Sequence, residues 1–328
     1  MEQQYIGADL SKKSIDLASH LSKDHIRIEN AASGFKNMLQ WLKQQHLGYK
    51  EITVVMEHTG LYGYRFEAFL NNLQIRYVKV PALAIKRSLG ITRGKTDKQD
   101  AARIATYAYQ KREELKQEVP VAANIERMQL LYSSRERLVK QRASMLCTIK
   151  ELENIDLKKT DLLLKAPVQL VAYITKQIEK YEVELEQLII GDKGLYQTFQ
   201  LLTSIKGVGK VLAIATIIKT RNFTRFSDAR KFACFCGTAP FKHESGTSIK
   251  GRTRVSHLAD KKMKALLDLS AKCAMRYDPE LKSFYERRTE EGKPKMSTIN
   301  IIRNKIIYRM FAVVKRQSPF VTDYLYQN

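Results

Sequence analysis

The chain has 328 residues, and its 57 Lys and Arg residues against 34 Asp and Glu give a formal net charge of +23. A hydrophobic share of 44% supplies apolar cores, which excludes a disordered basic tail. So much positive charge requires a polyanionic partner, and nucleic acid is favoured over an anionic membrane surface because phosphate neutralisation releases counterions. No apolar run reaches the length of about 18 residues that a membrane helix needs, and MEQQYIGADL is not a signal peptide. We therefore expect a soluble protein of the cytoplasm.

The first hundred residues alternate between strand and helix patterns. Strands are expected over residues 5–10, 14–19, 24–28, 52–56 and 75–80, and helices over 35–45, 64–73 and 97–111. The segment 52–56, ITVVM, is short, apolar and β-branched, which is typical of a buried strand. The order predicts an α/β domain with a mixed sheet.

The middle of the chain predicts two long helices. Apolar residues recur at alternating spacings of three and four, which is a coiled-coil seam. The expected seam positions are Met128, Leu131, Arg135, Leu138, Arg142, Met145, Ile149 and Leu152, then Val171, Ile174, Ile178, Tyr181, Leu185 and Leu188. The polar stretch 154–167 separates them, so we expect an antiparallel helical hairpin. It either spaces two domains or forms an oligomerisation surface, and Arg135 and Arg142 on the seam favour the second.

The last third, from about residue 196, predicts a mainly helical domain. Its segment 204–210, SIKGVGK, resembles a helix-hairpin-helix turn, in which glycines let backbone N–H groups approach a DNA phosphate. Lys206 and Lys210 would then contact the DNA backbone. Glycines that serve helix packing alone are the alternative.

Residues 236–252, CGTAPFKHESGTSIKGR, form a predicted long loop rich in Gly, Ser, Thr and basic side chains, of a kind that often carries function. Ser245 precedes a glycine and is a candidate nucleophile if a base, a lowered pKa or a metal activates it. Ser248 offers a second hydroxyl. A solvated or phosphate-binding turn is the alternative for an isolated Ser-Gly pair. The basic side chains expected to contact phosphate here are Lys242, Lys250 and Arg252.

Four acids occupy separate elements. Asp9 lies in the first predicted strand, Glu57 ends the fourth, and Asp97 and Asp100 open the helix of 97–111. Taken singly, each acid has a simpler explanation: Asp9 faces solvent on an edge strand, and Glu57 marks the end of a strand. Asp97 and Asp100 open a helix, whose dipole favours acids at its N-terminus. Together they have the layout of an RNase H-like domain, where clustered carboxylates hold divalent cations. Oxygen ligands favour Mg²⁺ or Mn²⁺, and two such ions can clamp a phosphodiester. The nearby basic residues Arg93, Lys95, Lys98 and Arg103 would hold phosphates.

The combined pattern resembles the DEDD transposases of bacterial insertion sequence family 110, the bridge-RNA-guided recombinases. The resemblance rests on Asp9 in YIGADLSKKSID, Glu57 in VVMEHTGLYG, and Asp97 with Asp100 in GKTDKQDAARIA. It continues through SIKGVGK, CGTAPFKHESGTSIKG and the helical tail from His257. The parts follow in the same order over nearly the whole chain.

The resemblance implies three domains: a RuvC-like RNase H-fold domain (1–120), a coiled-coil hairpin (121–195) and a transposase domain (196–328). It implies that Asp9, Glu57, Asp97 and Asp100 are catalytic and bind Mg²⁺ or Mn²⁺. The catalytic serine of the family falls on Ser245, which would attack a DNA phosphodiester and form a covalent phosphoserine intermediate.

The partners implied are target and donor DNA, a structured bridge RNA that selects sequence by base pairing, and further copies of the chain as a dimer or a tetramer on DNA. No membrane is involved, and the expected location is the bacterial cytoplasm, at the nucleoid.

Two other functions compete with this one. A metal-dependent RuvC-like nuclease would cut branched DNA with water as the nucleophile, and the Ser-Gly loop and C-terminal domain argue against it. A non-enzymatic nucleic-acid binder would be indifferent to Mg²⁺ and to loss of Asp9 or Glu57. Four acids on the expected elements of a basic protein argue against that.

Overall fold

The computed structural model describes residues 3–58, 60–88, 96–155, 157–158, 161–245 and 249–321, without the side chains of 242–245, 249–250 and 252–253. The chain divides into two compact units, Met1–Pro120 and Val121–Asn328, each of which is described by itself. Within the described ranges, every helix is too short or too polar to cross a membrane.

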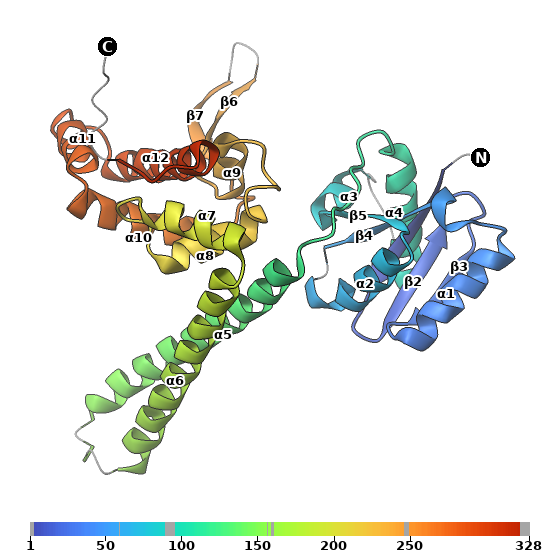
Figure 1. Ribbon diagram of the computed structural model, residues 1–328, viewed down its shortest axis with the longest axis horizontal. Helices are drawn as coiled ribbons and strands as arrows, with labels where there is room; N and C mark the ends of the chain where they lie inside the picture. The colour runs from blue at the N-terminus through green and yellow to red at the C-terminus, as the bar shows by residue number, and fades with distance from the viewer. Residues whose placement is uncertain are drawn as a thin grey trace. The chain divides into compact units, whose positions relative to one another are not determined.

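A five-stranded mixed sheet forms the centre of the first unit, with the order β3-β2-β1-β4-β5 (Figure 1). The strands β1 (Gln4–Leu10), β2 (Ser14–Ser19) and β3 (His25–Glu29) pair antiparallel, whereas β4 (Ile52–Glu57) and β5 (Arg76–Val80) run parallel to β1. All five predicted strands are present, with ends shifted by at most one residue. Because β1 and β4 are parallel neighbours, their carboxyl ends meet at the same edge of the sheet.

Helices cover both faces of this sheet. On one face, α1 (Ala32–Gln44) and α2 (Tyr64–Asn72) bury Phe35, Met38 and Phe66 against the strands. On the other, α3 (Ala82–Ser88) and α4 (Asp97–Gln110) contribute Ile85 and Ile104. Two short 3₁₀ segments, η1 (Tyr49–Glu51) and η2 (Gly60–Gly63), precede β4 and α2. The sequence did not predict α3, because seven residues are too few to show an apolar repeat.

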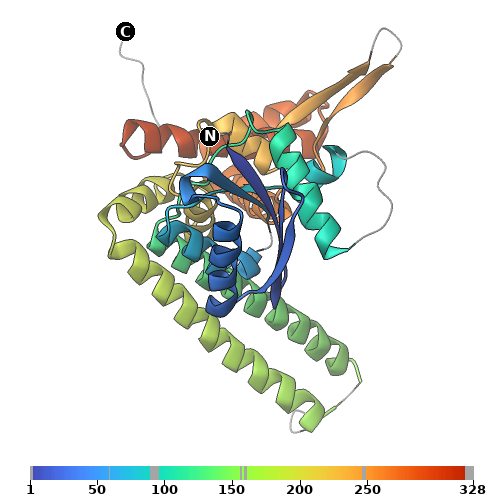
Figure 2. The ribbon, with the colours of Figure 1, turned by 90° about the vertical axis from the view of Figure 1, so that its right-hand side faces the viewer.

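Helix α4 lies directly on β1 (Figures 1 and 2). A Cβ atom built at Gly7 would lie 2.1 Å from the carbonyl oxygen of Ala101 and 2.4 Å from the amide nitrogen of Ala105. Only a glycine allows the two backbones to approach this closely. Gly7 therefore fixes the position of α4 over the strand that carries Asp9.

We expect Gly7→Ala to destabilise the first unit by about 3 kcal/mol or more, because rigid backbone atoms on α4 cannot move away from the added methyl group. Urea denaturation followed by circular dichroism measures the change. The matched control is Gly209→Ala, where a built Cβ meets nothing within 4 Å. It should cost less than about 1 kcal/mol. Equal denaturation midpoints for the two variants would contradict this account of Gly7.

The second unit begins with two long helices, α5 (Ala123–Glu153) and α6 (Leu162–Ile190), packed as a hairpin. Every predicted seam position is buried or half-buried. Arg135 pairs with Glu182 of the same hairpin at 2.6 Å, and Arg142 donates a hydrogen bond to Thr175 at 3.5 Å. The seam arginines are thus engaged within one hairpin, which removes the reason to interpret them as selectors of a second chain.

The connection between these helices is shorter than predicted. Helix α6 begins at Leu162, so Pro167 lies inside the helix and not in a polar linker. Asp161 caps the helix by accepting a hydrogen bond from the backbone N–H of Leu163 at 2.9 Å. An Asp at this position satisfies a free helix N–H group and stabilises the start of the helix at Leu162.

The rest of the second unit is mainly helical. Its helices are α7 (Lys193–Thr203), α8 (Lys210–Thr220), α9 (Ala229–Phe235), α10 (Lys261–Tyr277), α11 (Pro279–Glu290) and α12 (Lys295–Arg316). Where a long loop was predicted, β6 (Pro240–Ser245) and β7 (Ile249–Val255) form an antiparallel ribbon. Polar and basic residues weaken the apolar alternation there, so the ribbon depends on backbone pairing that the sequence pattern does not reveal.

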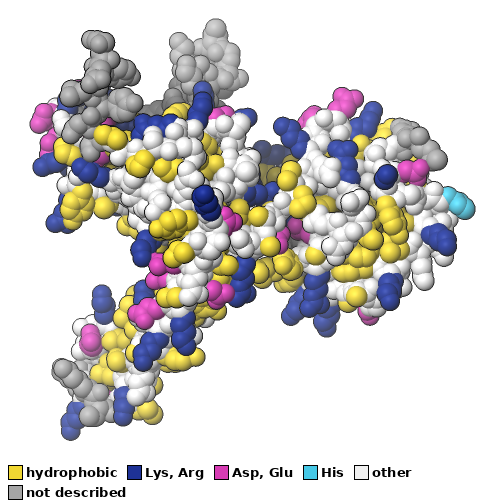
Figure 3. Space-filling model, viewed as in Figure 1, with side chains coloured by type: hydrophobic (Ala, Val, Ile, Leu, Met, Phe, Trp, Pro, Cys, Tyr) yellow, Lys and Arg dark blue, Asp and Glu magenta, His cyan; other side chains and the backbone are white. Residues whose placement is uncertain are grey.

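Lys and Arg side chains are spread over the visible surface of both units (Figure 3). This distribution agrees with the net charge of +23 and with a polyanionic partner that either unit could contact.

Candidate active site

The alternation of side chains along β1 and β4 aims two acids at the same face of the sheet. Ala8 and Met56 pack on the face covered by α1 and α2, so their successors Asp9 and Glu57 point to the face covered by α4. Ala8 lies opposite Met56 in the parallel pair β1–β4. Both carboxylates therefore lie on neighbouring strands at the carboxyl edge.

Helix α4 brings two more acids to this edge. Its first turn carries Asp97 and Asp100, and Thr96 caps it by accepting a hydrogen bond from the backbone N–H of Gln99 at 3.2 Å. The pKa of Asp9 is raised to about 6, mainly by burial and then, in decreasing order, by the negative charges of Asp100, Asp97 and Glu57. The structure thus brings the four predicted acids within electrostatic reach of one another.

A fifth acid, Asp16, was missed by the sequence analysis. It lies opposite Asp9 in the β1–β2 pairing and is only 3% exposed. The Nε2 atom of His25 lies 2.7 Å from its Oδ1 atom, and its charge also raises the pKa of Asp9. The signal was available, since Asp16 stands between two apolar residues of a strand just as Asp9 does.

Two arginines compensate part of this negative charge. Arg27 lies 3.7 Å from the carboxylate of Asp16 and 3.6 Å from that of Asp97. Arg103 contacts Asp100 at 2.9 Å, so this predicted phosphate ligand is engaged with an acid. Of the other basic residues predicted to hold phosphates, Lys98 is exposed, whereas Arg93 and Lys95 lie outside the described residues.

The acids suit a divalent cation by their chemistry, although their side chains do not converge on one ion. Across the described part of the chain, no three His, Cys, Asp or Glu side chains are grouped closely enough to hold a metal. Burial, and after it the charges of the neighbouring acids, nevertheless raise the pKa of Asp9, so the ionised carboxylate lacks a compensating cation. An all-oxygen donor set favours Mg²⁺ or Mn²⁺. Binding would require Asp97 and Asp100 to turn away from Arg27 and Arg103.

The candidate nucleophile lies in the second unit. The backbone of Ser245 ends β6 and pairs with Ile249 of β7. Its side chain and those of Lys242, Lys250 and Arg252 lie outside the described part of the structure, as does Ser248, so their predicted roles stay predictions.

Helix α12 anchors the base of this ribbon. The carbonyl oxygen of Thr238, two residues before β6, accepts hydrogen bonds from the side-chain amides of Asn300 and Asn304, both at 2.8 Å. The hydroxyl of Thr238 donates in turn to the Oδ1 atom of Asn304 at 2.9 Å. These buried bonds fix the point from which the ribbon with Ser245 leaves the helical core.

Of the two glycines in the turn between α7 and α8, Gly207 is required for the packing of helix α10. Gly207 has φ +92°, and a Cβ atom there would lie 2.7 Å from that of Ala274 on α10. Gly209 opens onto free space at the start of α8. Lys206 is exposed, whereas Lys210 pairs with Glu186 at 2.7 Å. A phosphate at this turn would therefore approach Gly209 and Lys206, and would compete with Glu186 for Lys210.

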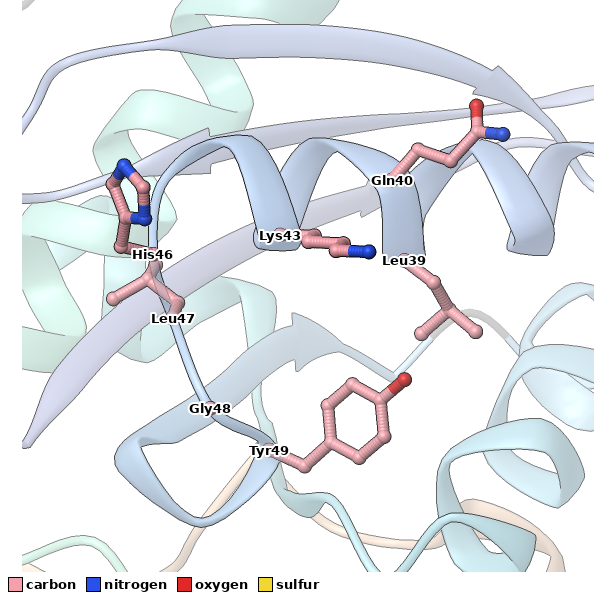
Figure 4. A pocket seen from close by; sticks show the side chains of 7 residues that line it. All are labelled: Leu39, Gln40, Lys43, His46, Leu47, Gly48 and Tyr49. Atoms are coloured by element: carbon pink, nitrogen blue, oxygen red, sulfur yellow. The ribbon is translucent and has the colours of Figure 1, made fainter.

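A shallow pocket of about 530 Å³ lies elsewhere in the first unit, with Lys43, His46 and Tyr49 around it (Figure 4). It lies between the end of α1 and η1, which leads into the amino end of β4. The pocket is therefore at the sheet edge opposite Asp9 and Glu57, and it is separate from the acids.

Most of the chain matches known transposase sequences. Residues 6–152 match the family model of the DEDD transposases of IS110, and residues 199–286 match that of the IS116/IS110/IS902 transposase family. The chain is 27% identical to the pilin gene-inverting proteins of Moraxella bovis and Moraxella lacunata, over 98% of each chain. It is 30% identical to an uncharacterised 43.6 kDa protein of insertion element IS110 from Streptomyces coelicolor, over 35% of this chain and 28% of that protein.

Proposed function

The chain belongs to the IS110 family of transposases, and from that membership we propose that it is an RNA-guided DNA recombinase that exchanges strands through a covalent phosphoserine link. Transposase or site-specific recombinase activity follows from the family and from the pilin gene-inverting relatives. The observation that carries the finer proposal is the group of four acids at one edge of the sheet, where burial and the neighbouring charges together raise the pKa of Asp9.

We assign the first unit to the RuvC-like variant of the RNase H fold. In support, three antiparallel strands are followed by two parallel ones in the order β3-β2-β1-β4-β5, with a helix rich in acids at its start placed over β1. We assign the coiled-coil hairpin to residues 121–195 and the transposase domain to 196–328.

In this mechanism Asp9, Glu57, Asp97 and Asp100 would hold Mg²⁺ or Mn²⁺, which would supply charge stabilisation for the attacking and leaving oxygens of the phosphodiester. Asp16 stays paired with His25 and lends its charge to the group without leaving the sheet. We assign Arg27 and Arg103, which lie beside Asp97 and Asp100, to the nonbridging phosphate oxygens.

Ser245 supplies the nucleophile. A bond forms between its Oγ atom and phosphorus while the bond from phosphorus to a deoxyribose oxygen breaks. The serine loses its proton, and the leaving oxygen takes one up. Attack by the rejoining strand reverses these steps and releases the serine. The charges of Lys242, Lys250 and Arg252 on the same ribbon, with Lys206, hold the DNA backbone, and a paired RNA selects the sequence.

RNA guidance is tested by purifying the tagged protein from bacteria that carry its gene with the flanking DNA, and by sequencing the bound RNA. We expect one structured noncoding RNA from the flanks, and strand exchange in vitro that depends on adding it. Expression without the flanks is the control. Strand exchange by protein free of RNA would refute the guidance and leave the recombinase activity intact.

A nuclease for branched DNA is the second candidate. One observation favours it: the acids all lie within the first unit, which could cut DNA with water as the nucleophile. The nuclease would leave hydrolysed DNA ends that are free of protein. Replacing Ser245 by alanine distinguishes this nuclease from the recombinase.

A further inference from the structure

Three large hydrophobic side chains are exposed on one short segment of the first unit. Leu61, Tyr62 and Tyr64 are 62%, 49% and 47% exposed, whereas the neighbouring Gly63 is buried. The segment η2 and the start of α2 carry them, directly after β4. Exposed hydrophobic side chains that gather in this way commonly mark an interaction site.

A single asparagine holds this segment beside the acids. The side-chain amide of Asn30 donates hydrogen bonds to the carbonyl oxygens of Ser11 and Tyr62, both at 2.9 Å. Ser11 follows the end of β1, just after Asp9, and Tyr62 lies in η2, the segment that follows the end of β4 at Glu57. Because the two strands end at the same edge, the Tyr62 backbone is fixed next to the edge that carries the acids.

Positive charges accompany the aromatic rings. Lys12 and Lys13 are exposed in the turn between β1 and β2, and Arg65 is exposed beside Tyr64. Cations neutralise the phosphates of a nucleic-acid strand, while aromatic rings stack on bases whose faces are open. Rings and cations side by side are therefore typical of a surface for an unpaired strand.

We propose that Leu61, Tyr62 and Tyr64 form a stacking platform for unpaired bases of the DNA strand whose backbone passes the acids. The assignment to DNA rests on the proposed function, since the acids act on the phosphodiester of that strand. Paired bases cover one another and offer no free face, whereas strand exchange opens the base pairs next to the cut. The platform holds the opened bases while Lys12 and Lys13 contact the phosphates.

The test measures binding of fluorescein-labelled oligothymidylate, about 20 nucleotides long, to the full chain by fluorescence anisotropy. Tyr62→Ala should weaken binding by about 5- to 150-fold, because stacking contributes about 1–3 kcal/mol per base, and Tyr62→Phe should retain it. The slope of log affinity against log salt should not change for Tyr62→Ala, because no phosphate contact is lost. Lys12→Ala should make that slope shallower.

Tyr49→Ala is the matched control, since Tyr49 is 40% exposed and lies at the opposite sheet edge (Figure 4). It should bind like the parent chain. Parent-like binding by Tyr62→Ala, or an equal loss in Tyr49→Ala, would overturn the platform. The same measurement with oligouridylate tests the choice of DNA over RNA. If Tyr62→Ala loses binding of oligouridylate but keeps that of oligothymidylate, that choice is overturned. Unchanged recombination by Asp9→Asn would instead refute the proposed function, and the binding result for Tyr62 would stand independently.

Discussion

Replacing Ser245 by alanine is expected to abolish the covalent protein–DNA product and to lower strand exchange by about a thousandfold or more. Alanine removes the oxygen that would bond to phosphorus, and the backbone pairing of residue 245 with Ile249 does not depend on that side chain. The measurement is a denaturing gel of labelled DNA, in which a protein-linked band runs slower than free DNA.

Ser248→Ala is the matched control for this experiment. It removes the second hydroxyl of the same segment and should leave the adduct in place. An adduct that persists in Ser245→Ala would disprove the serine assignment, and one lost only in Ser248→Ala would transfer the role to that residue. If Ser245→Ala still cuts branched DNA at the parent's rate and yields free ends, the nuclease is the better description.

Asp9→Asn should lower metal-dependent cleavage by about a hundredfold or more while RNA binding is largely retained. The asparagine keeps the size of the side chain but loses the charge that would hold a divalent cation between β1, β4 and α4. Cleavage is measured as adduct formation at increasing Mg²⁺ concentration, beside binding of the guide RNA. Recombination at the parent's rate would exclude a metal role for Asp9.

The same variant has a second readout that does not involve catalysis. Burial and the neighbouring acids raise the pKa of Asp9 from 3.8 to about 6. The folded chain therefore holds this proton more tightly than the unfolded chain, and the stability gained from it is lost as the pH rises through 6. Above that pH the ionised Asp9 destabilises the metal-free fold, so Asp9→Asn should unfold at a higher temperature at pH 8 than the parent.

The expected gain is about 1–2 kcal/mol, since one pKa unit corresponds to about 1.4 kcal/mol and partial exposure to solvent reduces the effect. The gain should shrink at pH 5, where Asp9 of the folded parent is mostly protonated and carries no charge. Added Mg²⁺ should stabilise the parent more than Asp9→Asn. Glu113→Gln, which alters an exposed acid, serves as the control and should show neither effect.

Local patterns explain why much of the first unit was predictable. The period-two alternation decided that Asp9 and Glu57 point away from the core formed by Ala8 and Met56. The spacing of α4 placed Asp97 on the same side as Asp100. These inferences need only neighbours along the chain, and local backbone geometry determines them.

Other features were missed or read differently because they depend on long-range pairing. Asp16 lies opposite Asp9 only once β2 pairs with β1 in a particular register. The sequence predicts that Gly207 binds phosphate, whereas in the structure it allows α10 to pack closely against the turn. The sequence predicts a loop where β6 and β7 form the ribbon, since the stability of the ribbon comes from hydrogen bonds between the two strands.

The sequence by itself determined the five strands and the longer helices of the first unit, the two long helices of the hairpin, the face on which each acid lies, and the positive charge that favours a nucleic acid as partner. Tertiary structure alone decided that Arg27 pairs with Asp16 and Asp97, that Asn30 joins the ends of β1 and β4, and that Arg135 is paired inside its own hairpin. The physical reason is the distance along the chain over which each interaction acts. Side-chain direction follows from dihedral angles within a few residues, whereas the partner of a charge or an amide depends on which distant segments the folded core brings together.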